Sequence, residues 1–310
     1  MRILHVIPQF AYFGGRTIVG GHASCLLSLA LAQHRAGEQV TILSYTEGVI
    51  GPRKIDDGPV LHSLFAQAKT RTVRFGLQFC QAALHWVRER HSEFDVIHVH
   101  SGYADYFLVS GRLKSKFGLP TIHTMYCPIP VQGGRWRLPG VHALIRRWAN
   151  RLDWCGGISD NVATSISEYG IRHPGRIRPA LDLERLADHG GGPAARRDLG
   201  LAEDDLVILF VGNAKPQKNA IGVLRALDRL HREFPRVKLV ITTELKHSSS
   251  NADLATLADA VRTMQLDSSI VQRGIVPNMP ALMHASDVLV APFLDSFGPS
   301  DYFMAALQAT

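Results

Sequence analysis

The chain has 310 residues, of which 46% are hydrophobic and 20% charged, values that are ordinary for globular proteins and exclude fibrous and disordered classes. This length predicts two domains that each bury a core. The formal net charge of +7 suits an anionic partner such as a nucleotide phosphate or an acidic membrane surface. The basic residues are scattered and form no nucleic-acid-binding motif, so we expect no nucleic acid partner.

Cysteine usage and apolar run lengths bear on the compartment. The four cysteines are far apart and show no zinc-site spacing, which predicts reduced thiols in the core. The apolar run between Arg2 and Pro8 is too short for a signal peptide. No apolar stretch reaches the roughly 18 residues that span a bilayer, so we expect a cytoplasmic protein.

The first half alternates short apolar runs with helical patterns. Gly37 stands where a glycine after a helix C-terminus is expected, and a polar stretch with glycine and proline follows the second strand. The predicted strands are 2–7, 40–44, 95–100, 121–125 and 155–159, and the predicted helices are 23–36, 73–90 and 141–152. This order predicts an α/β fold with a doubly wound parallel sheet.

The second half restarts the same alternation after a glycine-rich segment at 188–195, which is predicted to be the loop between domains. Strands are predicted at 206–212, 237–242, 270–276 and 287–291, and helices at 220–234 and 253–264. We therefore expect two Rossmann-like domains, residues 1–185 and residues 186–310.

Several segments, read in order, resemble one enzyme family along nearly the whole chain. They are GGHASCLLSLALAQHRAGEQVTIL (20–43), DVIHVHS (95–101), GLPTIHTMY (118–126), GGISDNVATSI (156–166), FVGNAKPQKN (210–219) and GIVPNMPALMHASDVLVAPFLDSFG (274–298). In this order they resemble the retaining glycosyltransferases of family 4, also called glycosyl transferases group 1.

The resemblance implies the GT-B fold, in which two doubly wound domains face a cleft. It further implies a retaining transfer of a hexose from a UDP- or GDP-sugar to a hydroxyl group on a glycan, lipid-linked or small-molecule acceptor. We expect no metal and no other cofactor, because the Asp-x-Asp metal motif of the other transferase fold is missing. Because the family continues beyond the position matched by Thr310, we expect an incomplete second domain.

The resemblance assigns the donor phosphates to a loop in the second half and to a glycine pair near the start. Lys218 matches the family lysine that neutralises the leaving diphosphate, and Gly212 lets the backbone approach a ligand. Asn213 replaces the usual arginine, so Lys215 is a candidate for the missing charge. Gly20 and Gly21 precede a long helix, where bare amides form an anion site. The alternatives are a solvated lysine and a plain turn.

Further candidates face the donor sugar and ribose. His123 lies at the end of a predicted strand and matches a family histidine beside the donor sugar, whereas His98 and His100 are interpreted as packing or surface positions. The family has two glutamates separated by seven residues. Here Gln308 takes the second position, and the first falls out of register, which leaves Asp295 and Asp301 as candidate acids beside Gly298.

Two questions stay open from the sequence. The amphipathic pattern at 141–152, preceded by Trp136 between two arginines, suits peripheral contact with an anionic membrane, although packing on its own sheet is the commoner case. A catalytically impaired nucleotide-sugar-binding scaffold and a sugar-nucleotide epimerase remain alternatives to the transferase. A nicotinamide dehydrogenase is disfavoured, because neither half has Gly-x-Gly-x-x-Gly after its first strand.

Overall fold

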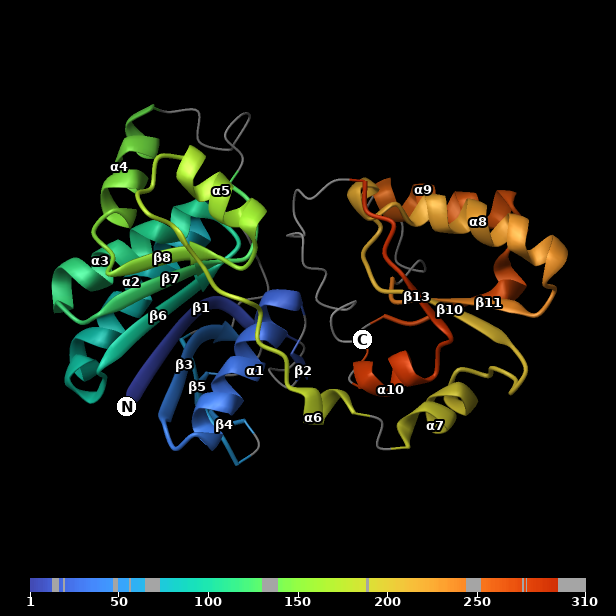
Figure 1. The fold of residues 1–310 in the computed structure, drawn as a ribbon, viewed down its shortest axis with the longest axis horizontal. Helices are drawn as coiled ribbons and strands as arrows, with labels where there is room; N and C mark the ends of the chain where they lie inside the picture. Colours follow the sequence, from blue (N-terminus) through green and yellow to red (C-terminus); the bar gives the residue numbers. More distant parts are fainter. Residues whose placement is uncertain are drawn as a thin grey trace. The chain divides into compact units, whose positions relative to one another are not determined.

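The computed structural model divides the chain into two compact units between Asp182 and Leu183, and each unit is considered by itself (Figure 1). The sequence placed this boundary three residues later, after residue 185. The structure describes residues 1–12, 17–18, 20–46, 50–55, 57–64, 73–129, 139–187, 190–243, 252–274, 276 and 278–294.

The first unit is built on a nine-stranded sheet in the order β4-β5-β3-β1-β6-β7-β8-β9, with β2 paired to β1. The strands are β1 (Arg2–Tyr12), β2 (Thr17–Ile18), β3 (Gln39–Thr46), β4 (Gly51–Lys54), β5 (Val60–Ser63), β6 (Val96–Ser101), β7 (Thr121–Met125), β8 (Trp154–Gly157) and β9 (Gly175–Arg176). The β1–β2 and β4–β5 pairs are antiparallel, and the other pairs are parallel. The predicted parallel sheet is therefore confirmed for its centre, and β4 lies where only a polar loop was expected.

Helices cover both faces of this sheet because successive strand residues point to opposite sides. Ile7 and Ile42 pack against α1, whereas Leu4 and Val99 lie in the core under α2 and α3. The helices are α1 (Gly21–Arg35), α2 (Val73–Arg90), α3 (Phe107–Phe117), α4 (Pro139–Ala149) and α5 (Asp160–Glu168), with 3-10 turns η1 (His91–Glu93) and η2 (Ala104–Tyr106).

The second unit repeats this plan around a four-stranded parallel sheet in the order β12-β11-β10-β13. Helices α8 and α9 lie on one side of this sheet, and α7 and α10 lie on the other (Figure 1). Phe210 and Leu239 pack against α8 and α9, whereas Leu209 and Val240 pack with Leu282 of α10. The elements are α6 (Leu183–Leu186), α7 (Gly191–Asp198), β10 (Leu206–Phe210), η3 (Pro216–Lys218), α8 (Ala220–Glu233), β11 (Val237–Ile241), α9 (Ala252–Thr263), η5 (Asp267–Ser269), β12 (Ile270–Gln272), α10 (Met279–His284) and β13 (Val288–Val290).

The glycine-rich segment before the second sheet is helix α7, so the prediction of a loop over 188–195 is wrong for its last five residues. The physical reason is a close helix contact. A Cβ added to Gly191 would lie 2.9 Å from the Ala281 Cβ, and one on Gly192 would lie 2.7 Å from the His284 carbonyl oxygen. Glycine's helix penalty of about 1 kcal/mol is accepted here because only glycine lets α7 pack this closely on α10.

The amphipathic helix α4 packs within the first unit. Ile145 and Ala149 are buried, Leu144 is 45% exposed, and the Trp148 side chain lies over Gly111 of α3. Trp136 and its flanking arginines lie outside the described residues. In the part of the chain that the structure describes, no helix has both the length and the apolar content to cross a membrane.

Candidate functional site

The carboxyl edge of the second sheet presents the loop between β10 and α8. In open α/β sheets this edge is where ligands bind, because the loops there follow the strand ends and the helices begin there. The Leu294 amide donates to the Gln217 carbonyl oxygen over 3.0 Å, which ties the segment after β13 to the turn η3. Two predicted positions of the donor site, Gly212 and Lys218, lie in this loop.

Gly212 and Lys218 are adjacent in space. A Cβ added to Gly212 would lie 3.0 Å from the Phe210 ring and 3.7 Å from the Lys218 Cβ, so a larger residue would crowd the turn. The Lys218 Nζ lies 3.9 Å from the centre of the Phe293 ring. The structure thus holds the predicted phosphate-binding lysine against an aromatic face, which stabilises a cation without neutralising its charge.

The other predicted residues of this loop shape its backbone. The Lys215 amide donates to the Asn213 Oδ1 over 3.2 Å, and both side chains are exposed. Asn219, which the sequence analysis did not single out, has a φ of 57° and accepts a hydrogen bond from the Gly222 amide at 3.2 Å. This cap orients the first turn of α8 at the same edge, where its positive dipole end favours an anion.

Two threonines after β11 complete the edge and were also missed. Thr242 accepts a hydrogen bond from the Gly212 amide at 3.2 Å, and the Thr243 hydroxyl donates to the Gly212 carbonyl oxygen. Both bonds fix the glycine turn. A threonine at the end of a buried strand was the available signal, but only the pairing of β10 with β11 brings it to Gly212.

Four predicted donor-site residues cannot be placed. Asp295, Gly298, Asp301 and Gln308 lie outside the described residues, so their roles stay predictions.

The predicted anion site of the first unit lies at the start of α1. Gly20 is exposed, has a φ of 100° that favours glycine, and accepts a hydrogen bond from the Ser24 amide, while Gly21 begins the helix. The predicted helix is confirmed, and it starts two residues earlier than expected. No acidic side chain lies in its first turn, which leaves the positive end of the helix dipole uncompensated there.

His123 is enclosed by its own unit. Its Nε2 lies 2.8 Å from the Ser101 hydroxyl and its Nδ1 lies 2.9 Å from the Ser110 hydroxyl, and the Phe107 ring packs 4.2 Å from the imidazole. The side chain is fully buried, and burial lowers its pKa to about 3. A sugar hydroxyl could reach a ring nitrogen only if one serine bond broke, so contact with the donor stays a prediction.

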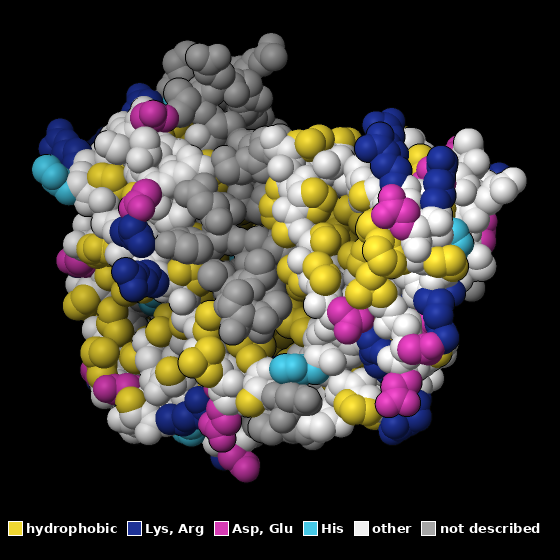
Figure 2. Space-filling model, turned by 45° about the vertical axis from the view of Figure 1, so that its right-hand side comes forward, with side chains coloured by type: hydrophobic (Ala, Val, Ile, Leu, Met, Phe, Trp, Pro, Cys, Tyr) yellow, Lys and Arg dark blue, Asp and Glu magenta, His cyan; other side chains and the backbone are white. Residues whose placement is uncertain are grey.

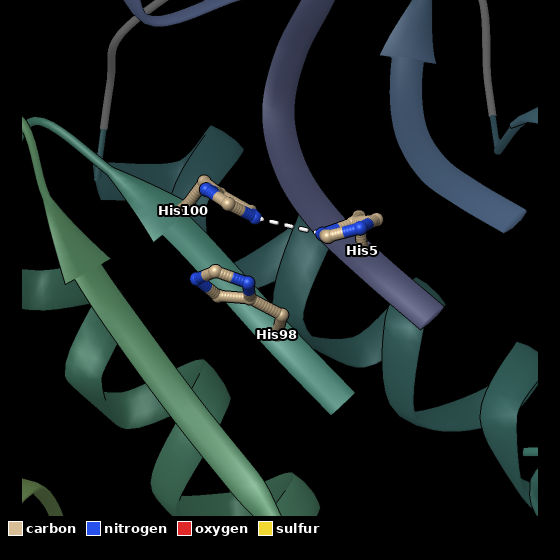
Figure 3. Close-up of side chains that lie close together, drawn as sticks. All are labelled: His5, His98 and His100. Atoms are coloured by element: carbon tan, nitrogen blue, oxygen red, sulfur yellow. Dashed lines mark hydrogen bonds between the residues drawn. The ribbon is translucent and has the colours of Figure 1, made fainter. Parts of the chain in front are cut away.

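A second group of histidines lies on the α1 side of the same sheet, and the sequence analysis did not combine them. His5 of β1 pairs in register with His98 of β6, and His100 is two residues further along β6, so all three side chains share one face (Figure 3). The His5 Nδ1 lies 2.9 Å from the His100 Nε2. All three are buried, and desolvation lowers their pKa values, that of His5 to about 4.

This histidine layer opens onto a small cavity inside the first unit. Its volume is about 20 Å³, enough for roughly one water molecule. The lining residues come from α1, β6, β7 and the segment before the unit boundary: Cys25, Leu29, His98, His100, Thr124, Tyr126, Ile158, Ile177, Arg178 and Ala180. Burial raises the pKa values of Cys25 and Tyr126, so both groups are neutral and protonated at pH 7.

Positive and negative side chains are interspersed on the surface. On the face drawn in Figure 2, lysine and arginine side chains lie in small groups beside acidic ones. The expectation that nucleic acid is not a partner stays a prediction.

Comparison with protein families decides the classification. A family model described as "Glycosyl transferase 4-like domain" matches residues 20–179, and one described as "Glycosyl transferases group 1" matches residues 193–300. The chain belongs to glycosyltransferase family 4. The matched ranges lie on either side of the boundary between the two units, so the chain carries one domain of each kind.

Curated relatives of this chain include D-inositol 3-phosphate glycosyltransferases. The enzyme of Streptomyces scabiei is 25% identical over 252 residues, which cover 73% of this chain and 54% of the relative. That of Geodermatophilus obscurus is 29% identical over 161 residues, or 47% of this chain and 34% of the relative. The chain therefore spans about half or less of the length of these relatives.

Solved structures confirm the GT-B fold. Sucrose-phosphate synthase from Thermosynechococcus elongatus superimposes with a TM-score of 0.76 at 15% identity, covering 100% of this chain and 79% of that one. Anabaena HepE, in complex with UDP-glucose, gives a TM-score of 0.71 at 14% identity, with 100% and 78% covered.

Proposed function

We propose that this chain carries the acceptor-side and donor-side domains of a glycosyltransferase that moves a hexose from a UDP- or GDP-sugar to a hydroxyl acceptor with retention of configuration. The observation that carries the proposal is Lys218, held beside Gly212 at the edge where α8 begins. A diphosphate placed there meets a cation and the positive end of a helix together.

The charge of the leaving diphosphate decides which groups matter in this reaction. As the bond to the sugar breaks, negative charge grows on the diphosphate, and donors fixed in advance stabilise it more than water does. We assign this role to Lys218 and the Gly212 amide region, with Lys215 and Asn213 at the rim. In this proposal the lysine replaces a bridging metal ion, so transfer proceeds without one.

The acceptor is proposed to bind the first unit. The inositol phosphate acceptors named for the curated relatives favour a small phosphorylated polyol. The exposed start of α1, with Gly20 and Gly21, is suited to such a phosphate as well as to that of the donor. The cytoplasm, where nucleotide-sugars are made, is the proposed location, and docking of α4 on an anionic membrane stays a prediction.

Thermal unfolding with UDP, GDP, ADP and CMP in turn tests the donor site. A nucleotide at about 100 times its dissociation constant stabilises the folded state by roughly 2.7 kcal/mol, which is a rise of several degrees. We expect one nucleotide to raise the melting temperature of the chain. Lys218→Ala should abolish this rise because the diphosphate loses its cation.

Lys238→Ala is the matched control. Lys238 lies near the start of β11, at the opposite edge of the same sheet, where its ammonium donates to the Ser268 carbonyl oxygen. This variant should keep the nucleotide response. If no nucleotide shifts the melting temperature, or if both lysine variants respond like the original chain, the proposed donor site is wrong. Nucleotide-sugar binding without transfer of the hexose would favour the scaffold alternative.

A further inference from the structure

Three buried imidazoles lie on the face of the sheet that packs against α1, beside apolar core residues. Ile7, two residues along β1 on the same face as His5, packs into the core under α1. His5 and His100 have no exposed surface, and His98 is 4% exposed. Burying polar rings in such a place is costly unless every ring nitrogen finds a partner. The three rings have six nitrogens, and each nitrogen therefore needs a hydrogen-bond partner or a metal ion.

One nitrogen of each ring is held by an oxygen at the edge of the cluster. The His5 Nε2 lies 2.7 Å from the Gln33 Oε1, the His98 Nε2 lies 2.8 Å from the Thr124 Oγ1, and the His100 Nδ1 lies 3.1 Å from the Tyr126 hydroxyl. Metal-binding histidines have this arrangement, in which an outer oxygen fixes the ring while the second nitrogen faces the ion.

We propose that His5, His98 and His100 bind one divalent transition-metal ion of the zinc class, which clamps β1 to β6 (Figure 3). One potential ligand nitrogen from each ring lies within 4.8 Å of those of the other two. Three neutral imidazoles without a carboxylate are a donor set for zinc or cobalt rather than for calcium or magnesium.

The rings must rearrange to accept the ion. Two nitrogens at 2.0–2.1 Å from a tetrahedral zinc ion are about 3.3 Å apart, whereas His5 Nδ1 and His100 Nε2 lie 2.9 Å apart, so these two rings separate by a few tenths of an ångström. The ligand nitrogen of His98 lies within 4.8 Å of the other two, so the His98 ring turns to bring this nitrogen to the ion. The ring proton of His100 moves from Nε2 to Nδ1, and Nδ1–H then donates a hydrogen bond to the Tyr126 hydroxyl oxygen. The ring stays neutral, so no proton is released.

A water molecule in the cavity beside the cluster would be the fourth ligand of the ion. His98 and His100 line it together with Cys25 and Tyr126, and its volume of about 20 Å³ matches one water molecule. Three histidines and a water are a known zinc coordination. All of these residues belong to the first unit, whereas the proposed diphosphate site belongs to the second, so we assign the ion a structural role that holds β1 and β6 together.

A metal-free arrangement is the competing outcome. In it, the Tyr126 hydroxyl donates to His100, His100 donates to His5, and His5 donates to Gln33 along one chain of hydrogen bonds. That arrangement binds no ion, so metal titration separates the two.

The test is titration of the full chain, without a histidine tag and after treatment with a chelator, with Co²⁺. We expect the visible absorption of a four-coordinate cobalt site to saturate at one ion per chain, and Zn²⁺ to displace it. His100→Asn should abolish the absorption. The control His142→Asn should leave it unchanged, because His142 contacts a tyrosine hydroxyl on the other side of the unit but lies outside the cluster.

A milder variant keeps the test decisive if His100→Asn does not fold. Thr124→Val preserves the shape of the side chain and removes only the outer oxygen of His98, so zinc affinity should fall about 10–100-fold. Zn²⁺ should also raise the melting temperature of the original chain relative to chelator. Absence of both the cobalt absorption and the zinc-dependent rise in melting temperature would overturn the proposal. The proposal would also be wrong if His100→Asn and Thr124→Val both bound the metal as tightly as the original chain.

Discussion

The chemistry of one buried imidazole shows how position decides what a histidine does. His123 has the Ser101 and Ser110 hydroxyls on its two nitrogens. The Ser101 hydroxyl also lies 3.0 Å from the Tyr103 carbonyl oxygen, and the Ser110 hydroxyl lies 3.2 Å from the Phe107 carbonyl oxygen. The neutral imidazole donates to one of these two serines and accepts from the other. The ring is therefore a neutral link between β6, β7 and α3.

This link predicts a specific dependence of stability on pH. The pKa of His123 is about 3 in the folded chain against 6.5 in the unfolded one. Below pH 6.5 only the unfolded chain takes up the proton, so the free energy of unfolding falls by roughly 1.4 kcal/mol per pH unit toward pH 3. The contribution is fully present above pH 6.5.

Urea denaturation of the original chain and of His123→Asn at pH 7.5 and pH 5 measures the effect. The original chain should be the more stable at pH 7.5, and its advantage should shrink by about 2 kcal/mol at pH 5. If the free energy of unfolding of the two chains changed by the same amount between pH 7.5 and pH 5, His123 would be accessible to protons in the folded state, as a sugar-binding histidine would be.

The sequence predicted the role of Lys218 but not the cluster of His5, His98 and His100. Lys218 was predicted because the segment FVGNAKPQKN (210–219) resembles the family's donor-site motif, which is contiguous in the sequence. The histidine cluster was not predicted, because it depends on the register between β1 and β6, which pairs His5 with His98 across 93 positions. Pairing register is a tertiary property, and no local pattern encodes it.

The contact between α3 and α4 depends on one missing side chain. A Cβ added to Gly111 would lie 2.5 Å from the Trp148 Cβ and 3.0 Å from the Trp148 carbonyl oxygen. Gly111→Ala gains up to about 1 kcal/mol of helix propensity but must push the helices apart, so we expect a net loss of about 1–3 kcal/mol. Chemical denaturation measures it.

Gly140→Ala is the matched control for this contact. Gly140 lies in the first turn of α4, and an added Cβ would meet nothing within 4 Å. With only the propensity and unfolded-state terms at work, this variant should be neutral or slightly stabilising. Equal effects of the two substitutions would mean that α3 and α4 are not packed as closely as the structure shows.

Elements with a strong periodic pattern were predicted well, and short or glycine-bearing ones were not. The helix at 73–90 was predicted to the residue. Helix α3 was missed although Gly118, with a φ of 72°, marks its end, because Ser110 and Gly111 interrupt its apolar stripe. Ser110 hydrogen-bonds His123, and Gly111 makes room for Trp148. The local sequence pattern does not show these tertiary partners.

At the scale of the molecule, the described core residues form separate clusters in the two units. Leu4 and Ile7 belong to clusters of the first unit, and Phe210 and Leu209 to clusters of the second. The sequence predicted both sheets because buried parallel strands are continuous apolar runs. The predicted boundary after residue 185 falls inside α6, which is a single short turn and has too few residues to show a helical pattern.

Separate cores predict that ligands of one unit stabilise that unit alone. Differential scanning calorimetry of the full chain should resolve two transitions, and Gly111→Ala identifies the first unit by lowering one of them. The nucleotide should then raise only the other transition, whereas Zn²⁺ should raise only the one that Gly111→Ala lowers. A single transition that moves with both ligands would mean that the units unfold together. A nucleotide shift confined to the first unit would place the donor phosphates at Gly20 and Gly21 rather than at Lys218.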